Sequence, residues 1–317
     1  MSSGFGHMLN IVVPCYNEEL VLPETAAKLS SLVDQLVADD LAAEGSGIYF
    51  VDDGSRDGTW TIITALQAGR PDRFHGIKLS RNRGHQSALL AGLRNAPGEA
   101  LISIDADLQD DITVIPSMIQ KFREGYDIVY GVRYGRASDT LFKRTTARTY
   151  YWLLRAMGVS IVPDHADFRL MSRRALKALE QYQEVNLFLR ALVPLLGFQS
   201  TSVYYNRLPR MAGESKYPLG KMLALAANGV TSFTMQPLRM ISLAGLLVSV
   251  VSFLLALWAL YVATMTNRGV PGWASIVVPV ALVGGLQLAS LGVIGEYIGK
   301  IYLEVKRRPA FDIEEII

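Results

Sequence analysis

Short apolar runs alternate with helix-like stretches over roughly the first 135 residues of the chain. The runs have the length and the β-branched content of buried strands, and apolar residues recur at helical spacing between them. The predicted strands are Leu9–Pro14, Ile48–Asp52, Phe74–Leu79, Ala100–Asp105 and Asp127–Val132. The predicted helices are Glu18–Leu41, Trp60–Ala68, Gln86–Asn95 and Pro116–Glu124, with Asn17 as N-cap of the first. This alternation predicts an α/β fold with a mostly parallel sheet and helices on both faces.

Two uncharged segments near the end of the chain each have the length of a membrane span. They lie at about residues 240–264 and 276–296, the second being free of charge as far as Ile294. At ~1.5 Å per residue, such a helix crosses a hydrocarbon core of about 30 Å. Basic residues flank the pair on both sides, against Arg268 alone in the loop. The positive-inside rule therefore predicts a two-helix transmembrane hairpin with both termini in the cytoplasm.

These patterns divide the chain into five segments. Residues 1–8 have the composition of an expression scar and are excluded from the fold. We expect a cytoplasmic domain over 9–215, an interfacial or juxtamembrane helix over 216–238, the hairpin over 239–301 and a cytoplasmic tail over 302–317. Basic amphipathic helices suited to a membrane surface are expected at Leu141–Met157 and Tyr217–Met235.

Composition restricts the possible partners. A net charge of +2 over 317 residues gives no general basis for binding nucleic acid. The single cysteine, Cys15, excludes an intramolecular disulfide and lies in an apolar run, which favours a packed thiol.

The end of the fourth predicted strand carries two carboxylates. Asp105 and Asp107 would face the same way in an extended segment, so their charges repel unless a cation or water lies between them. Gln109 adds a neutral oxygen on the same side. Oxygen ligands favour Mg²⁺ or Mn²⁺ over zinc. A solvated acidic turn would also explain an isolated pair of this kind.

Other strand ends suit a nucleoside and its phosphates. Asp52 and Asp53 can accept hydrogen bonds from a base or a ribose, or form an ordinary Asp-Gly turn. Arg83 follows the third strand and suits a phosphate, whereas we interpret His85 as structural. The loop at residues 210–217 suits a mobile lid over phosphates or a basic patch on anionic lipid.

Together these motifs resemble the family 2 glycosyltransferases with the GT-A fold. They are most similar to the polyprenyl-phosphate group, which includes bactoprenol glucosyltransferases and dolichol-phosphate mannose synthases. The motifs are, in order, Val-Pro-x-Tyr-Asn-Glu, Asp-Asp-Gly-Ser, Asp-x-Asp-x-Gln, Asp-Phe-Arg-Leu-Met and Arg-x-x-Gly-x-Ser-Lys-Tyr. The resemblance covers nearly the whole chain and implies a Rossmann-like GT-A domain. One departure is Ala166, where many relatives have glycine.

The resemblance implies a role for each matching position. Asp105, Asp107 and Asp167 would be the catalytic residues, with Asp167 orienting the sugar or, as the lesser option, acting as a base. Asp107 and Gln109 would ligate Mg²⁺ or Mn²⁺. Arg133 and Arg144 are the candidates for the acceptor phosphate. The nucleotide sugar would be bound by Pro14, Tyr16, Glu18, Asp52, Asp53, Arg83, Arg210, Ser215 and Lys216.

The implied reaction is an inverting, metal-dependent transfer of a sugar to undecaprenyl phosphate, with UDP-glucose as the expected donor. It would take place at the cytoplasmic face of a bacterial inner membrane and serve cell-surface glycan modification of the O-antigen type. Two alternatives stay open. A processive polysaccharide synthase would carry Gln-x-x-Arg-Trp, which residues 236–240 match only in part. A non-catalytic nucleotide-sugar-binding scaffold or translocator is the other.

The glycines of the second predicted span are also consistent with a homo-oligomer. Small residues let helices approach closely, so glycines in the second span would pack the two spans together or against copies of the chain. These glycines are Gly284, Gly285, Gly292, Gly295 and Gly299.

Overall fold

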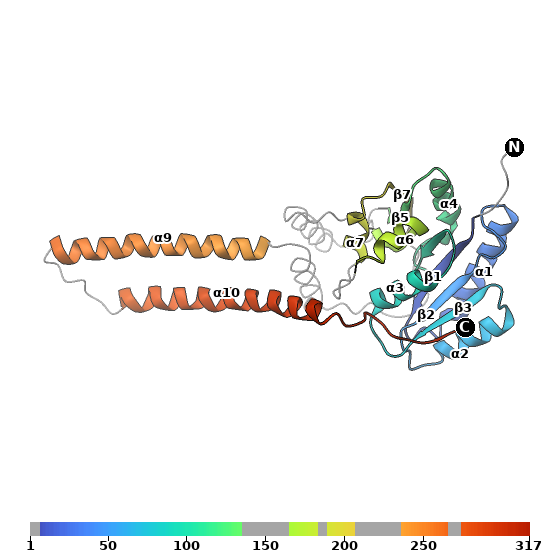
Figure 1. Cartoon of the computed structure of the whole chain (residues 1–317), viewed down its shortest axis with the longest axis horizontal. Helices are drawn as coiled ribbons and strands as arrows, with labels where there is room; N and C mark the ends of the chain where they lie inside the picture. Colours follow the sequence, from blue (N-terminus) through green and yellow to red (C-terminus); the bar gives the residue numbers. More distant parts are fainter. Residues whose placement is uncertain (1–6, 135–164, 183–188, 207–235, 266–273) are drawn as a thin grey trace. The chain divides into compact units, whose positions relative to one another are not determined.

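A computed structural model describes residues 7–134, 165–182, 189–206, 236–265 and 274–317 (Figure 1). The chain divides into two compact units. Of the described residues, one unit comprises 7–134, 165–182, 189–206 and 307–317, and the other comprises 236–265 and 274–306.

An eight-stranded mixed sheet forms the first unit, in the order β7-β5-β6-β4-β1-β2-β3-β8. The strands are β1 (Leu9–Cys15), β2 (Ile48–Asp52), β3 (Phe74–Leu79), β4 (Ala100–Ser103), β5 (Ile128–Arg133), β6 (His165–Ser172), β7 (Ser200–Tyr205) and β8 (Ile313–Ile316). Neighbours among β4, β1, β2 and β3 are parallel, as are β5 and β7. Strands β6 and β8 pair antiparallel with their neighbours. The predicted α/β class and the first five strands are therefore confirmed.

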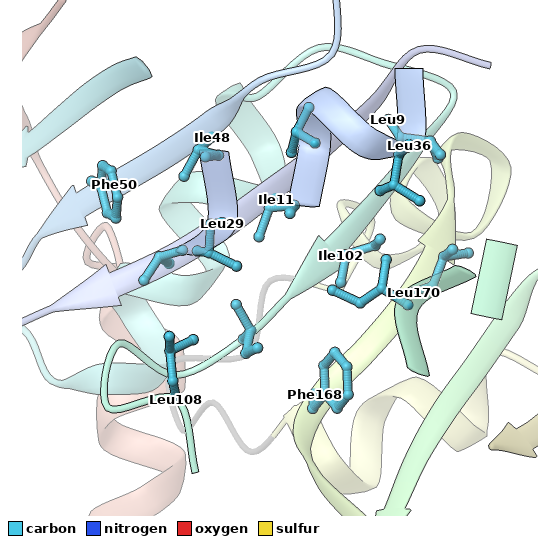
Figure 2. Packing of buried hydrophobic residues seen from close by; sticks show 14 of the residues in the cluster. Leu9, Ile11, Leu29, Leu36, Ile48, Phe50, Ile102, Leu108, Phe168 and Leu170 are labelled. Carbon is cyan, nitrogen blue, oxygen red and sulfur yellow. The ribbon is translucent and has the colours of Figure 1, made fainter. Parts of the chain in front are cut away.

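The helices of this unit cover both faces of the sheet. They are α1 (Leu22–Ala38), α2 (Thr59–Gly69), α3 (His85–Asn95), α4 (Ile115–Arg123), α6 (Arg173–Leu179) and α7 (Leu189–Leu195). Leu29 and Leu36 of α1 belong to one core cluster with Ile11 of β1 (Figure 2). Val12, which faces the other side of the strand, meets α3 at Gly92.

The predicted start of the first helix is wrong by four residues. Helix α1 begins at Leu22 with Val21 as its N-cap and a proline in its first turn. Asn17 is no cap: it has a φ of 56° and its Oδ1 accepts a hydrogen bond from the backbone N–H of Arg56 at 2.9 Å. The polar side chain that suggested a cap instead joins two loops.

The expected tail contains a strand that the sequence pattern did not reveal. Strand β8 pairs antiparallel with β3, and the N–H and C=O of Ile317 both bond Gly76 at 2.9 Å. Three of its four residues are exposed, so the run lacks the apolar alternation that identifies a strand.

The second unit contains two long helices, α9 (Gln236–Met265) and α10 (Ala274–Lys306), which contact each other. The two segments predicted as membrane spans lie within these helices, one in each. Among the residues that the structure describes, no helix combines the length and the apolar character needed to cross a membrane. The membrane crossing of this hairpin therefore stays a prediction.

We expect Gly92→Ala to destabilise the sheet unit by about 1–3 kcal/mol, because overpacking forces neighbours to move. A Cβ there would lie 2.8 Å from Cγ2 of Val51 and closer still to Val12. Thermal unfolding of the full chain measures the effect. Gly69→Ala, where a Cβ meets nothing within 4 Å, is the matched control. Equal melting temperatures for the two variants would contradict the close packing of α3 on the sheet.

Candidate active site

The loops after β1 and β2 hold each other through backbone and side-chain hydrogen bonds. The N–H of Asn17 donates to Ser55 Oγ at 2.9 Å, and the N–H of Glu18 donates to Thr59 Oγ1 at 2.9 Å. This places the predicted nucleoside residues of the two loops side by side. Tyr16 lies in the loop after β1 and is 41% exposed, so it is accessible to a ligand.

Asp53 fixes the loop that follows β3. Its Oδ1 accepts the N–H of Arg83 at 2.7 Å, and its Oδ2 accepts the N–H of Gly84 at 2.8 Å. Gly54 permits this approach, because a Cβ there would lie 2.6 Å from the backbone nitrogen of Asn82. Both oxygens of Asp53 are thus used inside the protein.

Asp52 is fully buried and only half satisfied. Its Oδ1 accepts the N–H of Ser55 at 3.2 Å, and its Oδ2 has no hydrogen-bond partner in the described part of the chain. Burial raises the pKa of Asp52. Asp52 thus keeps one unpaired carboxylate oxygen among the described residues, whereas both oxygens of Asp53 are occupied.

The acidic residues after β4 lie in a turn rather than on an extended edge. The strand ends at Ser103, and the N–H of Leu108 returns to the carbonyl of Asp105 at 3.3 Å. Leu108 has a φ of 45°, a conformation held by burial of its side chain. Thr25 of α1 donates to the carbonyl of Ala106 at 2.6 Å. The turn, not strand alternation, sets where Asp107 lies.

The turn concentrates negative charge. Burial, together with the charges of Asp167, Asp110 and Asp107, raises the pKa of Asp105 to about 6, against the opposing effect of His85. Within the described ranges, no group of three or more His, Cys, Asp or Glu residues could hold a metal ion. A metal held by Asp107 and Gln109 would therefore need oxygen atoms of a bound ligand to complete its coordination shell. The side-chain oxygens of these two residues and the negative charge of the neighbouring carboxylates fit a hard divalent cation.

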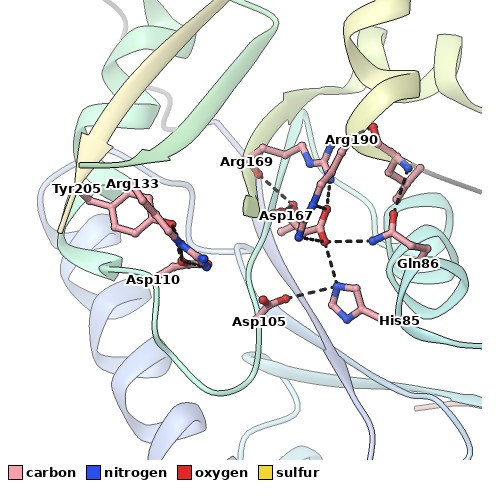
Figure 3. A network of polar contacts seen from close by, with 11 residues as sticks. His85, Gln86, Asp105, Asp110, Arg133, Asp167, Arg169, Arg190 and Tyr205 are labelled. Atoms are coloured by element: carbon pink, nitrogen blue, oxygen red, sulfur yellow. Dashed lines mark hydrogen bonds and ion pairs between the residues drawn. The ribbon is translucent and has the colours of Figure 1, made fainter. Parts of the chain in front are cut away.

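The carboxylate of Asp167 on β6 is the centre of a buried polar network (Figure 3). Its Oδ1 accepts from Arg169 at 2.7 Å and from Arg190 Nε at 3.3 Å. Its Oδ2 accepts from Arg190 Nη2 and Gln86, each at 3.1 Å, and lies 3.4 Å from His85 Nε2. Although burial acts in the other direction, these partners hold the pKa of Asp167 well below its usual range. An ionised carboxylate so fully engaged is suited to orienting its partners and poorly suited to accepting a proton.

His85 connects this network to the acidic turn. Its Nε2 lies 3.4 Å from Asp105 Oδ1 as well as from Asp167. Burial disfavours the charged ring, but the two carboxylates outweigh it and raise the pKa of His85. The structural interpretation made from the sequence did not foresee this position between two predicted catalytic residues.

Sequence reasoning also passed over three other members of the site. Arg169 stands two residues after Asp167 in the quoted motif, so strand alternation was an available signal. Asp110 directly follows Gln109 and accepts hydrogen bonds from Arg133 and Tyr205. Arg190 had no local signal.

Of the predicted phosphate ligands, Arg83 pairs with Asp312 of the C-terminal segment. Arg144, Arg210, Ser215 and Lys216 lie outside the described residues, as do both predicted amphipathic helices. Pro14 lies buried at the end of β1, in register with Val51.

The mixed sheet carries acidic loops at the carboxyl ends of its parallel strands, which is where ligands bind in open α/β sheets. Residues 10–180, more than half of the chain, match the model of glycosyl transferase family 2. The protein belongs to that family.

Relatives match over nearly the full length. An uncharacterized glycosyltransferase of Bacillus subtilis, YkoT, is 50% identical over 309 residues, covering 97% of this chain and 91% of its own. A bactoprenol glucosyl transferase of Shigella phage SfII is 38% identical over 311 residues, or 97% of each chain. Among solved structures, a mannosyltransferase from Pyrobaculum calidifontis in complex with GDP-Man and Mn²⁺ has a TM-score of 0.45 and 16% identity. The match covers 94% of this chain and 85% of that one.

We expect Asp53→Asn to destabilise the protein by about 1–3 kcal/mol, because the new amide directs N–H groups at a backbone donor. Thermal unfolding tests this against Asp39→Asn, a matched change at an exposed carboxylate. A melting temperature for Asp53→Asn equal to that of the control would show that the loop does not depend on these bonds.

The pKa of His85, measured by NMR titration of the metal-free protein, should lie above its usual value of about 6.5. Because the folded-state pKa is raised, His85 stabilises the fold fully below about pH 6.5 and loses this contribution as pH rises through the folded pKa. Asp105→Asn should lower the pKa, since one facing charge is removed. An unchanged His85 titration in that variant would contradict the contact.

Proposed function

We propose that the protein transfers a sugar from a nucleotide sugar to a polyprenyl monophosphate, giving a polyprenyl-phosphate monosaccharide. The supporting observation is the similarity to bactoprenol glucosyl transferases over 97% of this chain, a length that includes the helix pair as well as the GT-A-like unit. On this basis UDP-glucose is the first donor to test, and undecaprenyl phosphate the first acceptor.

The state of Asp167 agrees with this acceptor. A phosphate is already anionic at neutral pH and needs little help from a base, unlike a sugar hydroxyl. With no free base required, the chain's own task is to position the reactants and to stabilise charge. Direct attack of the phosphate oxygen on the anomeric carbon, opposite the departing diphosphate, inverts that centre.

Asp107 and Gln109 are the residues that would hold Mg²⁺ or Mn²⁺. The bound ion would supply charge neutralisation at the leaving diphosphate. Asp52, Tyr16 and Glu18 would bind the nucleoside, and Arg133 the acceptor phosphate.

The second unit has the composition for a membrane anchor. Along α9 and α10, large apolar side chains such as Leu246, Trp258 and Leu291 are about 60% exposed. We propose that these helices cross a bacterial inner membrane, with both termini cytoplasmic and the glycines of α10 at a contact within or between chains. The product would then serve cell-surface glycan modification of the O-antigen type.

A donor panel tests the proposal. The full-length protein is incubated with undecaprenyl phosphate, Mg²⁺ or Mn²⁺, and labelled UDP-glucose, UDP-galactose, UDP-GlcNAc or GDP-mannose. A labelled, lipid-extractable monosaccharide from one donor is the expected result. A growing polymer, or tight donor binding without turnover, would contradict it.

Asp107→Asn should abolish transfer while the protein keeps its melting temperature, because a neutral amide is a far weaker ligand for a hard cation. Transfer is measured as lipid-extractable label, with Asp39→Asn as the surface control. Near-normal turnover in Asp107→Asn would remove Asp107 from the metal site.

A further inference from the structure

A second buried ion pair lies beyond the acidic turn and takes no part in the Asp167 network. Asp110, 2% exposed, uses a single oxygen for three donors. Its Oδ1 accepts Arg133 Nη2 at 2.8 Å, Arg133 Nε at 3.1 Å and the hydroxyl of Tyr205. Arg133 Nε also lies 3.2 Å from the Tyr205 oxygen. Asp110 and Tyr205 thus bind the same edge of the Arg133 guanidinium, the edge formed by Nε and Nη2 (Figure 3).

The supports of this cluster are rigid. Arg133 and Tyr205 are register partners in the parallel pair β5–β7, so both stand at the carboxyl end of the sheet. The N–H of Tyr134 donates to the carbonyl of Tyr205 at 2.7 Å. The buried ring of Tyr205 packs edge-to-face on Phe168, with 5.5 Å between centroids. Phe168 is the neighbour of Asp167, so the two networks share a packed wall.

The guanidinium is held on one edge and open on the other. The side chain of Arg133 is 28% exposed, and its Nη1 has no hydrogen-bond partner among the residues that the structure describes. An arginine loses about 2 kcal/mol of rotamer freedom when it is fixed. Because the fold already fixes the Arg133 side chain, a phosphate that binds to it does not lose affinity to this ordering entropy.

We propose that Asp110 and Tyr205 are positioning residues that hold Arg133 with its free edge toward the phosphate of the lipid acceptor. This inference rests on the proposed function and deepens it, since it assigns how the acceptor is oriented. Asp110 follows Gln109 directly, so one short turn would set both the metal side and the acceptor side of the reaction. Alignment of two reactants by one rigid element is a large source of rate acceleration.

Steady-state kinetics of the full-length protein with undecaprenyl phosphate and its donor test the inference. Asp110→Asn and the milder Tyr205→Phe should raise the KM for undecaprenyl phosphate, Asp110→Asn by about tenfold, which equals ~1.4 kcal/mol. The KM for the nucleotide sugar should not change. Tyr205→Phe removes only a hydroxyl, so it keeps the test available if Asp110→Asn fails to fold.

The chain contains a control for loss of the charge of a buried aspartate that pairs with an arginine. Asp127 is buried and its Oδ1 lies 2.8 Å from Ser172 Oγ and 3.1 Å from Nε of Arg174, whose own side chain is 69% exposed. Asp127→Asn should lower the melting temperature and leave the KM for undecaprenyl phosphate unchanged. A purely structural role for Asp110 would make the two variants behave alike and would overturn the inference.

A double-mutant cycle separates positioning from a direct role. If Asp110 acts through Arg133, then Asp110→Asn should add little to the acceptor KM of Arg133→Ala. Full additivity, or an equal rise in both KM values, overturns the inference while transfer by the wild type keeps the proposed function. No transfer from any donor, with no binding of undecaprenyl phosphate by the wild type, instead rejects the proposed function and the inference together.

Discussion

One buried charge, the carboxylate of Asp167, connects the elements around the candidate active site. The carboxylate of Asp167 is 3% exposed and gathers partners from β6, from the start of α3 and from α7. An isolated charge at such a site would cost several kcal/mol, on the order of the penalty for breaking a buried ion pair. The two helices must therefore present their cations and amide at this point of the sheet. The position of His85 beside Asp105 follows from that requirement.

The turn after β4 distributes three tasks over six residues. Asp105 contacts His85, the N–H of Gln109 donates to Asp107 (the two residues proposed to hold a metal), and Asp110 accepts hydrogen bonds from Arg133. Leu108 lies within this turn and has a left-handed backbone conformation, with a φ of 45°. Because its side chain is buried in the core, the geometry of the turn depends on packing well below the surface.

Local pattern was sufficient for the parallel part of the sheet and insufficient for its edges. Strands β1 to β5 are mostly apolar and mostly buried, and such runs are evident in a single sequence. Strand β8 is charged and exposed, and it becomes a strand only because β3 offers it an unpaired edge. The same division holds for the site. Asp105, Asp107 and Asp167 stand in sequence motifs, whereas Arg190 reaches Asp167 across 23 residues of chain. Contacts of that kind depend on the tertiary fold and leave no local periodicity.

Strand β8 also decides where this chain can be shortened. The sheet unit consists of segments on both sides of the helix pair, so the last residues complete a sheet whose other strands lie before residue 206. A fragment cut before α9 would lose β8 and leave one edge of β3 unpaired. Exposed strand edges recruit other chains and promote aggregation. A shortened form that folds cleanly would therefore keep residues 309–317, joined back to the sheet by a linker in place of the two long helices.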